Sequence, residues 1–484
     1  MTDKQQDKQD KPGKEAEAVE LPPDGIRSIA DFDLAQDWIE AQLNLLEARP
    51  ILVHGDWYLY DKVTGVWEKH GNEVIMLSLA DMYHGKSYLS KGKIKVFRLS
   101  NGKWNAIACC THPQCIANDF FTSDARPRIG FLDGAMIYEQ GAEKLQRVVH
   151  DPLNRLRHKY DCTLEEMQET KCDDFHHFLE DILPSEKIRR IIQQYVGMCL
   201  LGAGTKLQKS LIFTGEGDNG KSTLLDIIEA IFPKGSVSTV SPSSIETDKY
   251  QVTSLEGSLI NLVDEAPGAD MKSTEAWKSI VSGGVVPARK PYGQPFSFRP
   301  IAGHIYCANN LPGTRDQSKG YWKRLVPIPF SRRLTAEEID TELGRRILEN
   351  ELPGIIRWAI QGAEEAIKAK WRIDTDDAGI KAVLQEWQAE SDSIRGWLET
   401  MEVDGAMSKK SWVPLRDLFN SFRTWCRDSE HRPCGWMKFR KRLEQTGVEV
   451  TRSQGGSYVA PVYELSKTQR ATTPDDASQD SIFG

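Results

Sequence analysis

Residues 215–222, Gly-Glu-Gly-Asp-Asn-Gly-Lys-Ser, decide the fold of this 484-residue chain. Gly215, Gly220, Lys221 and Ser222 occupy the four defining positions of the pattern G-x-x-x-x-G-K-[ST]. Glycines let the backbone turn so tightly that its N–H groups point inward at phosphate oxygens. The lysine can then reach the β- and γ-phosphates, and the serine can supply an oxygen to Mg²⁺. The stretch therefore predicts a phosphate-binding loop for a nucleoside triphosphate such as ATP.

The residues on either side of the loop support this prediction. Residues 210–214 form a short β-favouring run, and Leu224, Ile227, Ile228 and Ile231 recur at helical spacing. A helix that begins at the loop adds its dipole to the anion site. The residues expected to contact the nucleotide are Gly215, Glu216, Gly217, Asp218, Asn219, Gly220, Lys221, Ser222 and Thr223.

Two further hydrophobic strands are predicted downstream, and each ends in polar residues. Residues 259–263 precede Asp264 and Glu265, and residues 304–308 precede Asn309. In an NTPase, a carboxylate at a strand end holds the metal, and a second one polarises the attacking water. We therefore expect Asp264 to bind Mg²⁺ with Ser222, Glu265 to act as the general base, and Asn309 to sense the γ-phosphate.

Residues 282–298, between those two strands, predict a β-hairpin whose tip contains Arg289, Lys290 and Tyr292. The two cations suit phosphate contact, and the tyrosine suits a base or a sugar. Residues 271–333 carry eleven Lys/Arg against two Asp/Glu, although the whole chain has a net charge of −8. Because DNA affinity needs local phosphate neutralisation, we expect these three residues to bind DNA. A solvated hairpin tip is the alternative interpretation.

These motifs together resemble superfamily 3 helicases of the phage/plasmid primase–helicase type, a group that includes poxvirus-like replicative NTPases. The phosphate loop, Asp264-Glu265, the hairpin block and residues 308–312 follow one another in the family's order. The resemblance extends over residues 50–465. It includes an arginine-finger-like segment at 316–330, a helix at 352–359, and helicase-associated segments at 131–134 and 195–200.

The resemblance implies an ATP-dependent DNA helicase that replicates a phage, plasmid or other mobile element. It implies a homo-hexameric ring in which Arg324 of one subunit reaches the ATP of the next as a catalytic residue. It also implies 3′→5′ movement along single-stranded or forked DNA, with a primase, a polymerase or other replication proteins as partners. Gly284 departs from the family, which usually has an acidic residue at that position.

The expected fold class is α/β, with an AAA+-like P-loop NTPase core. The ranges expected are a disordered tail at 1–27, an α/β N-terminal helicase-associated domain at 50–205, the core with its following helices at 206–390, a winged-helix-like domain at 392–465, and a disordered tail at 466–484. The basic run at 439–443 favours a DNA-binding winged helix. A protein–protein module with a solvated basic helix is the alternative.

Nine scattered cysteines give no disulfide framework, which indicates a reducing cytoplasm. The family resemblance implies that this is the cytoplasm of a bacterial host or of a virus-infected cell. Cys109, Cys110, His112 and Cys115 invite a zinc site, but no second ligand pair stands at a finger-like spacing. A structural loop is therefore favoured there. The sequence shows neither a signal peptide nor a membrane span, so no membrane partner is expected.

Two other functions stay open from the sequence. A bifunctional primase–helicase would need an acidic pair on a strand with a supporting histidine before residue 205, and no such arrangement is evident. A P-loop ATPase that acts as an origin-binding initiator or loader would use the C-terminal basic module without processive unwinding.

Overall fold

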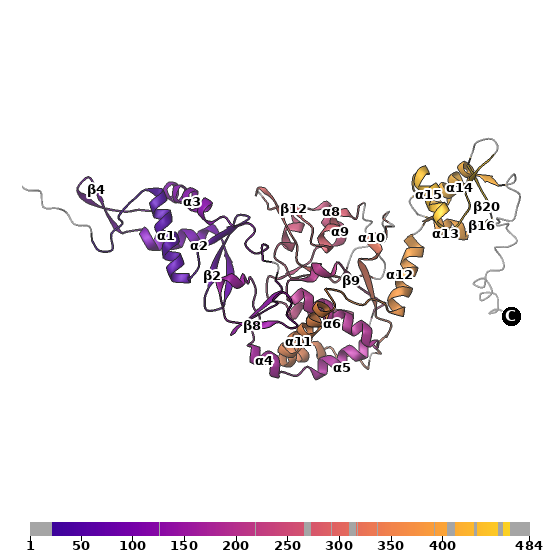
Figure 1. The fold of residues 1–484 in the computed structure, drawn as a ribbon, viewed down its shortest axis with the longest axis horizontal. Helices are drawn as coiled ribbons and strands as arrows, with labels where there is room; N and C mark the ends of the chain where they lie inside the picture. The colour runs from indigo at the N-terminus through magenta and orange to yellow at the C-terminus, as the bar shows by residue number, and fades with distance from the viewer. Residues whose placement is uncertain are drawn as a thin grey trace, which may run out of the picture. The chain divides into compact units, whose positions relative to one another are not determined.

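The computed structural model describes residues 22–124, 126–217, 219–265, 273–291, 293–308, 316, 318–335, 337–391, 393–403, 412–429, 433–453 and 458–464. The chain divides into two compact units, Met1–Thr170 and Lys171–Gly484. Both units combine helices and strands, in agreement with the predicted α/β class (Figure 1). The domain ranges drawn from the sequence stay predictions.

The first unit is built around helices and an antiparallel sheet of order β1-β2-β3. Trp38 of α1 and Trp57 of β2 are fully buried and meet edge to face, with ring centroids 6.0 Å apart. Such a pair contributes about 1 kcal/mol of stability beyond that gained from the apolar area that it buries. The elements are α1 (Asp31–Leu46), β1 (Ile51–Val53), β2 (Asp56–Asp61), β3 (Val66–His70), α2 (Asn72–Tyr83) and α3 (Asn101–Cys115).

The rest of the first unit consists of a hairpin, a second antiparallel sheet and short helices. These are β4 (Ser87–Ser90), β5 (Lys93–Val96), β6 (Arg128–Phe131), β7 (Gly134–Ile137), β8 (Gln146–Val148), the 3₁₀ turn Pro152–Asn154 and α4 (Leu164–Glu169). Residues 22–27, which fall inside the predicted terminal tail, belong to this fold. Ile26 is buried and its N–H donates to the Ser87 carbonyl at 2.8 Å.

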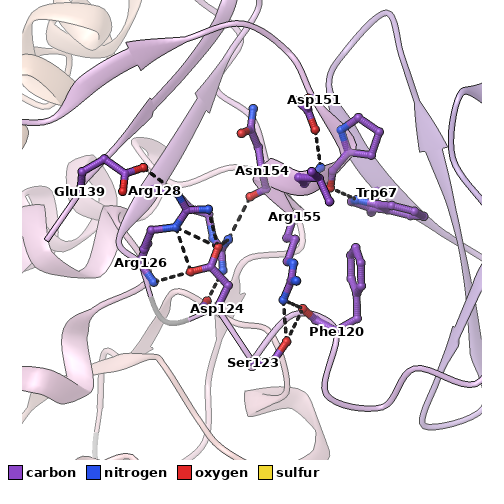
Figure 2. A network of polar contacts seen from close by, with 12 residues as sticks. Trp67, Phe120, Ser123, Asp124, Arg126, Arg128, Glu139, Asp151, Asn154 and Arg155 are labelled. Atoms are coloured by element: carbon purple, nitrogen blue, oxygen red, sulfur yellow. Dashed lines mark hydrogen bonds and ion pairs between the residues drawn. The ribbon is translucent and has the colours of Figure 1, made fainter.

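A polar network joins the loop after α3 to the β6–β8 sheet (Figure 2). The Asp124 carboxylate accepts hydrogen bonds from Arg126 and from Arg128, whose Nη1 also reaches the Asn154 carbonyl at 3.0 Å. Arg155 donates to the Phe120 carbonyl at 2.8 Å. Burial would raise the pKa of Asp124, but the bonds from Arg126 and the two positive charges hold it at about 2. The network therefore depends on the charged form of Asp124.

Helix α3 corrects one sequence interpretation. The cysteine-rich stretch predicted as a structural loop is helical through Cys115, and Ser100 caps the helix by accepting a bond from the Lys103 N–H. Cys109 is exposed on this helix and Cys115 is buried. Among the described residues, no group of three His, Cys, Asp or Glu side chains could hold a metal ion.

The second unit is organised by a five-stranded sheet in which all neighbouring strands run parallel. The order is β10-β11-β14-β9-β15, so β9 lies between β14 and β15. Every residue of β9 and β14 is buried, as expected for strands of a parallel sheet with both faces covered. The strands β9, β11 and β14 confirm the three strands predicted from the sequence. The five strands are β9 (Ser210–Thr214), β10 (Val237–Ser238), β11 (Ile260–Val263), β14 (Gly303–Cys307) and β15 (Leu325–Pro329).

Helices cover this sheet, and two of them cross with almost no space between their backbones. A Cβ added at Gly197 of α6 would collide with the Ala359 carbonyl of α11, and one added at Gly362 would lie 2.6 Å from the Gln193 carbonyl. The helical elements are α5 (Asp173–Ile182), α6 (Glu186–Leu200), α7 (Lys221–Ala230), α8 (Pro242–Thr247), α9 (Glu275–Val281), α10 (Lys319–Trp322), α11 (Leu343–Lys368), α12 (Ala378–Ser391) and the 3₁₀ turns Gly204–Leu207 and Gln251–Leu255.

The C-terminal module of the second unit has its own core, which includes Trp397, Phe422 and Phe439. Its sheets have the orders β16-β20 and β17-β19-β18. The elements are α13 (Ser393–Glu399), β16 (Met401–Val403), β17 (Val413–Pro414), α14 (Leu415–Asp428), α15 (Trp436–Gln445), β18 (Thr451–Arg452), β19 (Tyr458–Ala460) and β20 (Val462–Glu464). Across the described ranges, none of the helices combines the length and apolar character needed to span a bilayer.

The Asp124 network predicts an acid-dependent part of the stability. The folded pKa of Asp124, about 2, lies below the ordinary value, so its contribution is present above about pH 4 and is lost as the pH falls towards 2. We expect Asp124→Asn to lower the free energy of unfolding by about 2 kcal/mol at pH 7, and by progressively less below pH 4. Denaturant titrations at several pH values measure this.

A matched control is Asp161→Asn, which removes an exposed carboxylate that pairs with Lys159 at 2.7 Å. An exposed ion pair contributes about 0–1 kcal/mol, so this variant should unfold nearly as the wild type does. Equal losses in the two variants, or a pH-independent loss in Asp124→Asn, would contradict the assigned role.

Candidate functional site

The predicted phosphate loop lies between β9 and α7, at the carboxyl end of a central strand. Gly215 has a φ of 146° and Gly220 a φ of 78°, both in the region that favours glycine. A Cβ at Gly215 would lie 2.5 Å from the Phe330 carbonyl oxygen, and one at Gly220 would lie 2.6 Å from a methyl carbon of Ile182. Both glycines are therefore needed for this loop conformation, whichever ligand the loop binds.

Asn219 holds the loop in shape from within. Its side chain is buried, and its Nδ2 donates to the Glu216 carbonyl and, at 3.5 Å, to the Phe330 carbonyl. Its Oδ1 accepts a bond from the Lys221 N–H at 3.4 Å. The loop is thus fixed both to itself and to the end of β15. Asp218 lies outside the described residues.

Lys221 and Asp264 come together at the edge of the sheet. The Lys221 ammonium donates to the Gly215 carbonyl, inside the loop. Burial lowers the pKa of Lys221, whereas the nearby Cys307 and Asp264 act to raise it. Burial and, to a smaller extent, the charge of Asp264 raise the pKa of the Cys307 thiol to about 12. The loop lysine, the strand-end carboxylate and this thiol therefore form one cluster.

The remaining predicted nucleotide and metal residues have different surroundings. Ser222 is exposed in the first turn of α7, and Asp264 and Glu265 are exposed after β11. Thr223 is half-buried, and its methyl group lies 3.2 Å from the position of a Cβ added at Gly344 of α11. Thr223 therefore faces α11. Asn309 lies outside the described residues, although β14 ends directly before that segment.

These residues suit a magnesium–nucleotide complex. The two glycines let the loop pack closely against Phe330 and Ile182, and the Lys221 ammonium lies against the loop at the Gly215 carbonyl. Asp264 supplies the oxygen ligand that Mg²⁺ prefers, and Ser222 can supply a second. Burial together with the charge of Asp264 raises the pKa of Asp226, so a second carboxylate lies in the same electrostatic environment.

Arg324 lies at the amino ends of the strands, whereas the loop of its own chain lies at their carboxyl ends. Its carbonyl accepts a bond from the Ser210 N–H at 2.7 Å, and β15 then runs parallel to β9. The length of β9, about 13 Å at 3.3 Å per residue, separates this position from the phosphate loop. The guanidinium donates to Ser282 Oγ at 2.8 and 3.0 Å, and also to the Gly320 carbonyl.

The predicted hairpin is confirmed as β12 (Val286–Arg289) and β13 (Pro295–Phe298), which pair antiparallel. Near its tip, Arg289 Nε donates to the Gly293 carbonyl at 3.1 Å, and Lys290 Nζ lies 5.7 Å from the centre of the Phe296 ring. Tyr292 lies outside the described residues.

The departure at Gly284 has a steric reason. A Cβ added there would collide with the Ser279 side chain and would lie 3.1 Å from the Ser279 carbonyl. The Gly284 N–H donates to that same carbonyl at 2.8 Å, which closes the end of α9. An acidic side chain at this position, as in the resembling family, would require Ser279 to shift.

Two contacts in and around the site were missed from the sequence. Cys307 was predicted only as a strand residue, and Ser282 only as the start of the hairpin block. Both act through side chains from distant segments: Cys307 with Asp264, and Ser282 with Arg324. The position of Cys307, at the end of a strand that was already assigned to the site, was the available signal for it.

Comparisons with known proteins give a consistent class of relatives. Residues 213–324 match a family described as a family of unknown function (DUF5906). Over 331 residues the chain is 25% identical to "Putative helicase L207/L206" of Acanthamoeba polyphaga mimivirus, which covers 63% of this chain and 34% of that protein. Over 300 residues it is 23% identical to "Putative helicase 121R" of Invertebrate iridescent virus 3, with 55% and 31% covered.

The chain therefore spans about a third of the length of these relatives. Both relatives are proteins of large DNA viruses, and both are named as helicases. Among solved structures, the A form apo structure of the NrS-1 C-terminal region aligns with a TM-score of 0.45 and 12% identity, covering 88% of this chain and 98% of that one.

The contacts of Asn219 predict a preorganised loop. We expect Asn219→Ala to weaken ATP binding about tenfold, since it removes bonds to two carbonyls that keep the loop open. Titration with a fluorescent ATP analogue measures this. Asn350→Ala is the control, because Asn350 is an exposed asparagine of α11 that bonds only the Arg346 carbonyl at 2.8 Å. Unchanged affinity in a folded Asn219→Ala protein would show that the loop does not need this anchor.

Proposed function

We propose that this chain is an ATP-dependent DNA helicase that acts in the replication of a virus, phage, plasmid or other mobile element. The observation that supports the proposal most directly is the convergence of Lys221 and Asp264 beside the loop, at the carboxyl edge of a parallel sheet. The carboxyl edge of such sheets is where ligands bind. The helicase names of the viral relatives supply the class of reaction.

Each residue has a role that follows from its place. The ammonium of Lys221, held inside the loop, would contact the β- and γ-phosphates of ATP. Ser222 and Asp264 would hold Mg²⁺, which when bound neutralises charge on those phosphates. Glu265, which is exposed and follows Asp264, would accept a proton from the attacking water. Asn309 would sense the γ-phosphate from the end of β14.

Arg324 would act on a neighbouring subunit. It lies at the amino end of β15, so it cannot reach the loop of its own chain without crossing the sheet. A ring of subunits would bring it to the next nucleotide, where a guanidinium stabilises charge that develops on the γ-phosphate. This arrangement supports the homo-hexamer that the family resemblance implies. ATP would then be hydrolysed only between subunits.

DNA would be held by the β12–β13 hairpin. Arg289 and Lys290 stand near its tip, in a segment with a local excess of positive charge. Phosphate contacts from such a tip grip the backbone whatever the sequence, as a translocating enzyme requires. With the resemblance as its only support, we propose movement 3′→5′ along one strand.

An origin-binding initiator or loader remains the second candidate because of the C-terminal module. Phe439 and Leu443 of α15 are buried in its core, whereas Lys438 and Lys441 are exposed on the same helix. A helix with one buried face and one cationic face suits a DNA groove, as in a winged-helix-like domain. Binding of duplex origin DNA without unwinding by the purified protein would favour this function.

Strand displacement on tailed duplexes with ATP and Mg²⁺ tests the proposal. We expect unwinding by the wild-type protein and none by Lys221→Ala, which loses the phosphate contact but no core packing. Glu265→Gln should bind ATP with ordinary affinity and hydrolyse it at least about 100-fold more slowly, because an amide cannot accept the proton. A Lys221→Ala protein that hydrolyses ATP at the wild-type rate would overturn the site.

The trans role of Arg324 predicts complementation. Lys221→Ala and Arg324→Ala proteins should each lack ATPase activity, yet their mixture should recover part of it. In mixed rings, an intact loop meets an intact Arg324 across some interfaces. Steady-state ATPase over a series of mixing ratios measures the recovery, with native mass spectrometry to verify mixed assembly. If mixed assemblies form and stay inactive at every ratio, another residue supplies the charge.

A further inference from the structure

The β4–β5 hairpin of the first unit has a defined turn and strand register. Ser90 pairs with Lys93 across a two-residue turn, in which Lys91 has a φ of 50° and Gly92 a φ of 72°. Two positive φ values define the type I′ turn, whose twist matches that of paired strands. The ladder continues to the base of the hairpin, where the Phe97 N–H donates to the Lys86 carbonyl at 2.8 Å. The register of the hairpin is therefore fixed.

One strand of this hairpin is exposed along its whole length, although Tyr88 of the other strand packs against the core of the unit. All four residues of β5 are exposed, and the strand has no buried face. The register places Leu89, Ile94 and Val96 on one side, with Val96 57% exposed, and Lys93 and Lys95 on the other. Two-stranded ribbons gain little stability by themselves. Within the first unit, Figure 1 shows β4 extending away from α1, α2 and α3.

Positive charge is concentrated on this hairpin and at its base. No aspartate or glutamate occurs from residue 82 to residue 118, in a chain whose net charge is −8. In the part of the chain that the structure describes, no ion pair involves the five cations of the hairpin, whereas the neighbouring Lys103 pairs with Asp31 at 2.6 Å. The five are Lys86, Lys91, Lys93, Lys95 and Arg98.

We propose that the β4–β5 hairpin binds duplex DNA. The major groove of B-DNA, about 12 Å wide, admits a two-stranded β-ribbon. Lysines at the turn and along one face would neutralise the phosphates that line the groove, and the apolar face would contact base edges such as thymine methyl groups. This site is separate from the nucleotide site and does not depend on ATP. It would hold the duplex while the second unit acts on a strand.

A simpler role for exposed lysines is to prevent strand edges from pairing with other chains. That role needs a charge on an open edge, but here cations also occupy the turn at Lys91 and the base at Lys86 and Arg98. A complete absence of acidic residues from the surrounding segment is likewise not needed for edge protection. The distribution of charge fits an extended polyanion better.

The test uses the full-length protein without nucleotide and a labelled duplex of about 20 base pairs. Lys91→Gln, Lys93→Gln and Lys95→Gln are combined in one variant. The control combines Lys144→Gln, Lys171→Gln and Lys234→Gln, which change the net charge equally at exposed positions elsewhere. Anisotropy titrations over a series of salt concentrations give the affinity and its salt dependence, for the duplex and for one of its single strands.

We expect the hairpin variant to lose at least about tenfold in duplex affinity, with a slope of log affinity against log salt that is shallower by about 2.7, at 0.9 per phosphate contact. Single-strand affinity and ATPase activity should change little, and the control should bind as the wild type does. ATPase activity tests the proposed helicase function independently of duplex binding by the hairpin. A failure of the hairpin proposal can therefore be distinguished from a failure of the helicase proposal.

Three results would overturn the proposal. Wild-type duplex affinity and slope in the hairpin variant would show that the lysines do not contact DNA, and if that variant also self-associates, they only protect the strand edges. An equal loss of duplex affinity in the control variant would show that net charge, and not the position of the lysines, determines binding. A single-strand loss as large as the duplex loss would exclude the groove-binding geometry.

Discussion

The parallel alignment of β9, β11 and β14 is the constraint on which the rest of the second unit depends. Since these strands run in one direction, their carboxyl ends meet at one edge of the sheet, and with them the phosphate loop, Asp264 and Cys307. Segments almost a hundred residues apart in sequence are thereby brought into electrostatic contact. Lys221 and Asp264 are therefore near enough for the carboxylate to affect the pKa of the ammonium group.

The same alignment separates the site from Arg324. A residue at the amino end of β15 is the length of a strand away from the loop of its own chain. The Ser282 hydroxyl, which holds the guanidinium, follows α9 and precedes β12. Arg324 is therefore tied directly to the segment that leads into the β12–β13 hairpin. The residue proposed to act between subunits and the hairpin proposed to bind DNA are therefore joined by one short segment of backbone.

The sequence predicted those parts of the structure that local patterns encode. The loop, the hydrophobic strands and the hairpin each have a signature within about fifteen residues, and each is present. The bond between Arg324 and Ser282 and the cluster around Cys307 arise from tertiary register, which a single sequence does not reveal. Helix α3 was misread because Pro113 and closely spaced cysteines resemble a loop or a metal site. The cap at Ser100 and the tertiary packing of Ile107 outweigh that local appearance.

The crossing of α6 and α11 has a consequence for how this protein can evolve. Gly197 and Gly362 lie where the two backbones almost touch, so that neither position has room for even a methyl group. Any side chain at one of them would require the two helices to move apart, which would disturb the packing that both helices make with the rest of the unit. A single substitution at either glycine is therefore incompatible with the present helix crossing. Divergent copies of the chain should keep both glycines long after the surrounding surface has changed.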